Sequence, residues 1–91
     1  MSTDWDEISY VISSGYRVDV VRRLADSPAT PSQIAKDIDS PIAHVSRALK
    51  GLRDRGIVDL LVSEDRQKGR VYGITDHGRE LWQTIEAKNL A

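Results

Sequence analysis

Apolar side chains recur at helical spacing over the first quarter of the chain. Near the start, three of them fall at positions i, i+3 and i+4 of one face: Ile8, Val11 and Ile12. The helix that this pattern predicts begins near Asp4. The Ser-Ser-Gly stretch 13–15 interrupts it, as a kink or as a break in which Ser14 caps a second helix. This second helical run ends at Asp26, because the Ser-Pro-Ala stretch 27–29 follows it.

Two helix-start signals then follow one another closely. Thr30 is suited to cap a helix, Pro31 fills the first helical position, and Gln33 stands where a capping box requires it. Ser40 and Pro41 repeat the cap and the proline. The short distance between the two signals leaves room for only a short helix and a tight turn, so the pattern predicts a helix-turn-helix.

The second helix of this pair is predicted over residues 41–55, with Gly56 as its C-terminal glycine. Its apolar positions share one side and form the expected core face: Ile42, Val45, Leu49 and Leu52. The opposite side carries Ala43, Arg47, Lys50 and Asp54, and the flanks carry His44 and Ser46.

The pattern changes after Gly56. Residues 57–62 are mostly branched and apolar, residues 63–69 are polar, and residues 70–74 alternate, which predicts two strands joined by a turn. Thr75 then caps a final helix whose apolar stripe is Leu81, Trp82 and Ile85. The fold class is therefore α+β: a winged helix-turn-helix that is mainly helical, with a two-stranded β wing.

The chain has 91 residues, so we expect residues 1–91 to form one domain. It holds no apolar run long enough to span a membrane, and its acidic N-terminus does not resemble a signal peptide. The absence of cysteine excludes disulfides and thiolate metal sites. These features predict a cytoplasmic protein.

The distribution of charge is more informative than the net charge of −1. Between Pro41 and Val71 there are seven positive and four negative side chains, an excess of three positive charges, and the remainder of the chain carries an excess of four negative charges. The sign of the local charge governs the approach to a polyanion such as DNA. The predicted second helix and wing thus favour double-stranded DNA as the partner.

A helix of this kind enters the DNA major groove with its N-terminal half. We expect the recognition helix to contact DNA through Ser40, Ala43, His44, Ser46, Arg47 and Lys50. Arg47 has the chemistry for bidentate contact with guanine, while a phosphate contact is its main alternative. Ala43 is suited to a thymine methyl group and Lys50 to phosphate.

The polar turn at about 63–70 carries the second candidate contact. Arg66, Lys68 and Arg70 are cations suited to a narrow minor groove or to the DNA backbone. A charged hairpin that only maintains solubility is the alternative, since Glu64 and Asp65 share the turn.

The sequence shows no arrangement typical of an enzyme or a cofactor site. His44 and His77 are the only histidines, and neither a phosphate-binding glycine loop nor a nucleophile motif is present. We therefore expect no catalysis, no cofactor and no metal.

At this point the chain resembles small archaeal or bacterial winged helix-turn-helix regulators of the MarR and ArsR types. The resemblance runs from Tyr10 to Arg79 and is carried by four segments: Thr-Pro-Ser-Gln-Ile-Ala at 30–35, His-Val-Ser-Arg-Ala-Leu-Lys at 44–50, Arg-Gly-Ile-Val at 55–58 and Val-Tyr-Gly-Ile-Thr-Asp-His-Gly-Arg-Glu-Leu at 71–81. It implies a dimer, a palindromic operator and transcriptional control. The chain lacks the Cys and His clusters of metal-sensing ArsR types and the long flanking helices that hold an effector pocket in many MarR types, so any effector is unknown.

Apolar residues near both ends are expected to hold a homodimer together. They are Trp5, Ile8, Ile12, Leu81, Trp82 and Ile85, and packing within one subunit is the alternative. Two other functions stay open: a winged-helix module that binds protein within a larger assembly, and an architectural DNA binder without operator preference.

Overall fold

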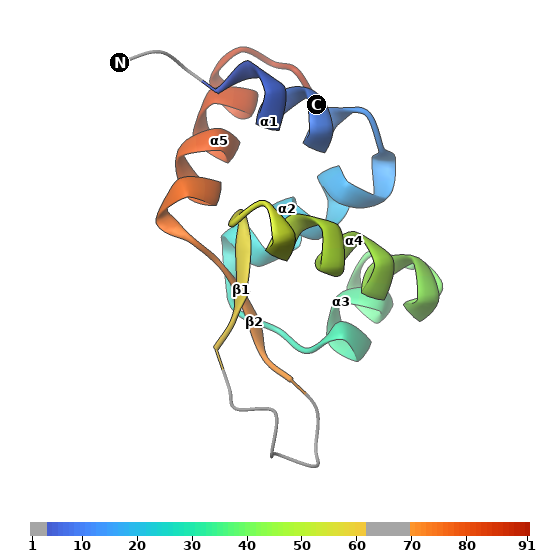
Figure 1. Cartoon of the computed structure of the whole chain (residues 1–91). Coiled ribbons are helices and arrows are strands. Elements are labelled where there is room, and N and C mark those ends of the chain that lie inside the picture. The colour runs from blue at the N-terminus through green and yellow to red at the C-terminus, as the bar shows by residue number, and fades with distance from the viewer. Residues whose placement is uncertain (1–3, 62–69) are drawn as a thin grey trace.

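The structure is a computed structural model and describes residues 4–61 and 70–91. Figure 1 shows its elements, which in chain order are α1 (Trp5–Ile12), α2 (Gly15–Asp26), α3 (Pro31–Asp37), α4 (Ile42–Asp54), β1 (Val58–Leu60), β2 (Tyr72–Ile74) and α5 (Asp76–Ala87). The predicted winged helix-turn-helix is confirmed: α3 and α4 form the helix pair, and β1 and β2 lead into and out of the wing. None of the helices in these two ranges is long and apolar enough to cross a membrane.

Side chains cap three helix starts: Thr30 and Thr75 do so as predicted, and Asp4 caps the helix that was predicted to begin near it. The Asp4 carboxylate accepts a hydrogen bond from the Glu7 amide at 3.2 Å, and the Thr75 hydroxyl accepts one from the Gly78 amide at 3.0 Å. Thr30 and Gln33 form a full capping box, with reciprocal bonds of 3.2 and 2.9 Å. These caps satisfy amides that have no partner inside the helix, and they determine where α1, α3 and α5 begin.

The start of α4 differs from the prediction. Pro41 itself occupies the cap position, with an extended backbone (ψ 139°), and its carbonyl accepts the first helical bonds, from His44 at 3.0 Å and Val45 at 3.3 Å. Ser40 therefore lies one residue too early to cap, and its hydroxyl is buried without a hydrogen-bond partner in the described part of the chain. Ser14 occupies the cap position of α2, but its side chain makes no capping bond either.

The sheet is small and antiparallel. Val58 pairs with Ile74, and Leu60 pairs with Tyr72. Ala29 also exchanges two backbone hydrogen bonds with Tyr72, of 3.0 and 2.9 Å, so the segment before α3 lies against β2. This pairing was not predicted, because residues 27–29 show only a helix end in the sequence.

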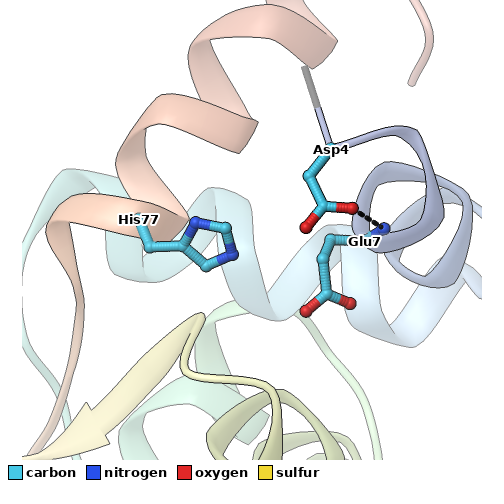
Figure 2. A group of neighbouring side chains, drawn as sticks. All are labelled: Asp4, Glu7 and His77. Carbon is cyan, nitrogen blue, oxygen red and sulfur yellow. Dashed lines mark hydrogen bonds between the residues drawn. The ribbon is translucent and has the colours of Figure 1, made fainter. Parts of the chain in front are cut away.

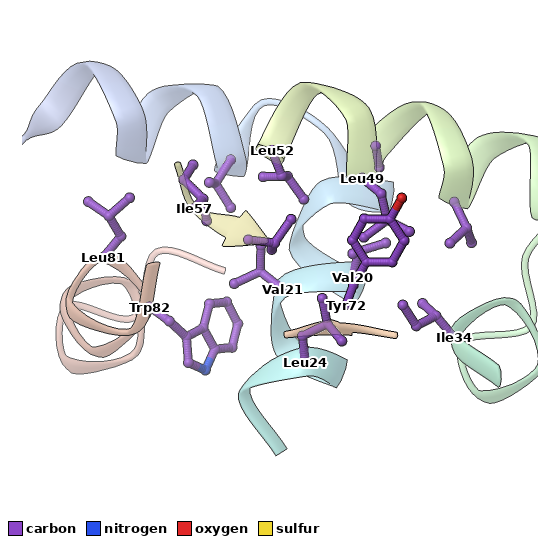
Figure 3. Packing of buried hydrophobic residues seen from close by; sticks show 14 of the residues in the cluster. Val20, Val21, Leu24, Ile34, Leu49, Leu52, Ile57, Tyr72, Leu81 and Trp82 are labelled. Carbon is purple, nitrogen blue, oxygen red and sulfur yellow. The ribbon is translucent and has the colours of Figure 1, made fainter. Parts of the chain in front are cut away.

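One apolar cluster joins all the elements around α2 (Figure 3). Val20, Val21 and Leu24 of α2 are almost fully buried, and α2 contacts every other helix and β2. Ala48 completes the core face of α4 together with Val45, Leu49 and Leu52. This central packing holds the helix pair rigidly against the body, because close-packed side chains resist displacement.

The structure corrects the prediction that Ile42 belongs to the core. Its side chain is 50% exposed. It belongs to the first turn of α4, which in Figure 1 reaches away from α1, α2 and α5, so the core covers little of it. An isoleucine at the tip of this helix is therefore available for contact.

The structure also corrects the prediction for four of the six residues expected at a dimer contact. Ile8, Leu81, Trp82 and Ile85 have exposed fractions of 1–5% within the single chain and belong to its core. Side chains buried in this way cannot form a surface for a second copy. Trp5 is 50% exposed and Ile12 is half-buried, so these two are still accessible.

Candidate nucleic-acid interface

The outward face of α4 carries the predicted polar and charged side chains. Ala43, Ser46, Arg47 and Lys50 are all exposed. Within the described ranges neither Arg47 nor Lys50 has an acidic partner, whereas Arg53 pairs with Asp59 at 3.4 Å and Arg55 pairs with Glu7 at 2.6 Å. The charge that faces solvent from the middle of α4 is thus available to an external anion.

His44 faces a different direction from these residues. Its ring packs against Tyr16 of α2, with the ring centroids 4.3 Å apart. Its Nδ1 atom is buried and has no hydrogen-bond partner among the described residues. This geometry favours a packing role between α2 and α4 for His44, one of the predicted DNA contacts.

A groove of about 1000 Å³ runs between α3, α4 and the base of the wing. Pro31 lies on its α3 side, Ile42 and Lys50 on its α4 side, and Arg70 and Tyr72 on the strand side. Ile42 is the functional candidate that sequence reasoning missed, because its spacing from Val45 and Leu49 is that of a core residue. Its position in the first turn, directly after a proline, was the available signal.

The opposite side of α4 is supported by Tyr10 of α1. The Tyr10 hydroxyl lies where a Cβ atom on Gly51 would be, so only glycine fits there without a shift. The Arg17 and Arg55 guanidiniums lie 3.8 and 3.9 Å from the centre of the Tyr10 ring, and Arg17 also donates to the Tyr10 carbonyl at 2.7 Å.

Glu7 completes this support at the C-terminal end of α4. The hydrogen bond that Arg55 donates to Glu7 raises the pKa of Arg55 above its ordinary value. Because the Arg55 guanidinium both pairs with Glu7 and lies over the Tyr10 ring, α1 is connected to the end of α4 through an ion pair and an aromatic contact.

The base of the wing is described, but its tip is not. Arg70 is exposed, and the Leu61 amide donates to the Val71 carbonyl at 2.7 Å, which continues the strand pairing toward the tip. Arg66 and Lys68 lie outside the described residues, so their predicted DNA contacts stay predictions.

A separate group of potential metal ligands lies where α1 and α5 begin. Figure 2 shows the carboxylates of Asp4 and Glu7 beside the ring of His77. The group belongs to the side of the molecule formed by these two helices and is not part of the exposed face of α4.

Comparison with solved structures identifies the class of fold. A MarR family regulator from Neisseria meningitidis, NMB1585, superposes with a TM-score of 0.74 at 18% identity, over 94% of this chain and 60% of that one. The S. aureus MepR–DNA complex gives 0.73 at 17%, over 91% and 70%. The homodimeric winged helix-turn-helix DNA-binding domain of Mb0332 from Mycobacterium bovis, a possible ArsR-family regulator, gives 0.76 at 15%, over 97% and 87%. The chain therefore has the winged-helix fold of MarR-type and ArsR-type regulators.

The sequence model of one family, described as the HVO_A0261 N-terminal domain, matches residues 5–88. Because the match takes in nearly the whole chain, the chain belongs to this family. No curated protein matches it closely enough to count as a relative. The chain spans little more than half of some solved chains that it resembles, 52% in one case and 60% in NMB1585.

Proposed function

We propose that this protein is a non-enzymatic, sequence-specific regulator of transcription that binds double-stranded DNA. The observation that carries the proposal is the exposed face of α4, where Arg47 and Lys50 have no acidic partner in the described ranges, opposite a fully packed core face. A rigid helix with free cations on its outward side fits a DNA major groove. The MepR–DNA complex shows that a protein of this fold binds DNA.

Within this proposal, the residues of α4 have separate roles. Arg47 donates two hydrogen bonds to guanine O6 and N7, and Lys50 contacts phosphate. Ala43 allows close approach to the base edges, and Ser46 lies on the flank toward the groove. The free amides of the first turn, beginning at Ile42, face a phosphate at the positive end of the helix dipole.

Ile42 adds an apolar contact to this set. Its exposed side chain lies on the groove wall with Ser46 and Lys50. Thymine is the base that presents a methyl group in the major groove, so an exposed branched side chain at the helix tip selects thymine by apolar contact.

The wing is proposed to hold the DNA backbone or the minor groove through Arg66, Lys68 and Arg70. Arg70 supports this role, since it is exposed at the end of the groove that α4 forms with the strands. Contacts to the DNA backbone do not read the bases, so they strengthen binding to all sequences and make the affinity depend on salt concentration.

A homodimer is the proposed working unit. Trp5 is half exposed on α1, and Leu90 is 37% exposed just beyond α5. In Figure 1, α1 and the chain end after α5 lie at the same end of the molecule, and the Lys88 ammonium is 5.9 Å from the centre of the Trp5 ring. Pairing of two copies through this end would place two recognition helices one DNA turn apart, about 34 Å.

A binding selection from random duplexes tests the proposed function, followed by a gel shift with the selected duplex and with the DNA upstream of the chain's own gene. We expect one enriched motif with two-fold symmetry. Enrichment without a motif would favour an architectural DNA binder. Absence of duplex binding at low salt would favour the protein-interaction module, which the acidic remainder of the chain supports. The cytoplasmic location stays a prediction from the sequence.

A further inference from the structure

Three side chains with metal-binding chemistry converge where α1 and α5 begin. One ligand atom from each of Asp4, Glu7 and His77 lies within 4.8 Å of the other two (Figure 2). His77 is far from Asp4 and Glu7 in the sequence, and packing of α1 against α5 brings it close to them. This convergence was not expected from the sequence, because two isolated histidines without cysteine do not indicate converging ligands.

In the described part of the chain, each of the two carboxylates has one oxygen that takes part in no hydrogen bond or ion pair. Asp4 uses Oδ1 to cap α1, and Glu7 uses Oε2 for Arg55. Asp4 Oδ2 and Glu7 Oε1 are thus able to serve as ligands while the cap and the ion pair persist.

The ligand set indicates the class of metal. One imidazole with two carboxylates suits borderline divalent ions such as Zn²⁺, Co²⁺ and Ni²⁺, whereas Mg²⁺ and Ca²⁺ prefer oxygen ligands alone. Three protein ligands leave the remaining positions to water. Around an ion with bonds of about 2.0–2.1 Å, neighbouring ligand atoms lie roughly 3 Å apart, so the side chains must close in by less than about 2 Å. Asp4 and His77 are exposed and can rotate by this amount.

We propose that Asp4, Glu7 and His77 form a binding site for a divalent transition-metal ion that links the start of α1 to the start of α5. Arg55 opposes binding, because its guanidinium is a neighbouring positive charge on Glu7. Metal binding at this site does not require DNA, so the experiments that test it are independent of the proposed function.

The chain offers a direct test, since it contains two histidines and no cysteine. Untagged protein is titrated with Co²⁺ while the ring nitrogens of His44 and His77 are followed by NMR, and its thermal unfolding is measured with and without Zn²⁺. We expect paramagnetic broadening at His77 and none at His44. When Zn²⁺ is about tenfold above its Kd, Tm should rise by roughly 5–10 °C.

Matched variants separate ligation from unspecific metal binding. His77→Asn and Glu7→Gln should lose the rise in Tm. His44→Asn and Asp6→Asn, an exposed neighbour outside the ligand group, should keep it. Asp4→Asn should lose it while keeping α1 capped, because asparagine caps as well as aspartate. Arg55→Ala should bind the metal several-fold more tightly.

Three results would each overturn the proposal. The first is an equal response of both histidines to Co²⁺, which indicates nonspecific binding. The second is a rise in Tm that persists in folded His77→Asn. The third is no rise in Tm in the parent protein with millimolar Zn²⁺.

Discussion

Single side chains determine what the outward face of α4 can recognise. Arg47 and Lys50 project from α4, whereas Arg53 near the end of α4 pairs with Asp59, and Arg55 directly after α4 pairs with Glu7. Pairing of Arg53 and Arg55 with acids leaves Arg47 and Lys50 as the cations of α4 without an acidic partner in the described ranges. This division of roles is visible only in the structure, since all four residues look alike in the sequence.

Ile42 gives a prediction about thymine. If its side chain contacts a thymine methyl, replacing that thymine by deoxyuridine should weaken binding of the parent protein by about 0.8 kcal/mol, the value of one buried methylene or methyl group. Ile42→Ala should bind both duplexes equally. Fluorescence anisotropy with each thymine of the selected site replaced in turn measures this. An identical penalty in parent and variant at every position would remove Ile42 from the interface.

The contact between Gly51 of α4 and Tyr10 of α1 leads to a prediction about the free energy of unfolding. Alanine in a helix interior normally stabilises by roughly 0.5–1 kcal/mol relative to glycine. Here the new Cβ would collide with the Tyr10 hydroxyl, so Gly51→Ala should instead lower the free energy of unfolding by about 1–3 kcal/mol. Chemical denaturation measures the change.

Two further variants serve as controls for this prediction. Gly15→Ala should be neutral or stabilising, because nothing lies within 4 Å of a Cβ there. Gly51→Ala in a Tyr10→Phe background should cost less than in the parent. A stabilising Gly51→Ala would show that Tyr10 moves aside freely.

At the scale of elements, we expect the wing and α4 to contribute differently to DNA binding. Replacing Arg66, Lys68 and Arg70 together by alanine should weaken binding to all duplexes. The slope of log affinity against log salt should fall by about one unit for each phosphate contact that is lost. Parallel salt titrations of parent and variant measure this. An unchanged slope would show that the wing does not touch the backbone.

Most elements could be predicted from the sequence, because local chemistry determines their ends. The Thr30–Gln33 capping box, the Thr75 cap and Gly56 with its positive φ of 73° are short-range signals. Features that depend on contacts between distant segments could not be predicted. The pairing of Ala29 with Tyr72 and the Tyr10–Gly51 contact are of this kind.

In the candidate site, too, local properties could be predicted from the sequence, and contacts with distant segments could not. Helical periodicity correctly placed Ala43, Arg47 and Lys50 on the outer face, because angle around the helix axis is a local property. It placed Ile42 in the core, since periodicity does not indicate where the neighbouring elements stop. The apolar stripe of α5 is visible in the sequence, but it was predicted as a dimer contact and instead packs inside the single chain, a difference that periodicity does not indicate.

At the scale of the whole molecule, two of the exposed apolar residues, Trp5 and Leu90, lie near the chain ends. Trp5→Ala should convert a dimer into a monomer with little loss of folding stability, because half of this side chain is exposed. Trp82→Ala should instead destabilise the fold by about 3–5 kcal/mol, since Trp82 is 5% exposed and belongs to the core. Sedimentation equilibrium at micromolar concentration, with thermal unfolding alongside, distinguishes the two effects. A parent protein with monomer mass would contradict the dimer.

The measurement that tests the central claim most directly is the affinity of three proteins for the selected duplex and for a scrambled duplex: the parent, Arg47→Ala and Arg79→Ala. Arg79→Ala changes the net charge equally but lies on α5, outside the proposed interface. We expect Arg47→Ala to weaken binding to the selected duplex by roughly 1–3 kcal/mol and to narrow the difference between the two duplexes. Arg79→Ala should bind like the parent. If Arg47→Ala binds the selected duplex as tightly and as selectively as the parent does, α4 does not read DNA in the way proposed.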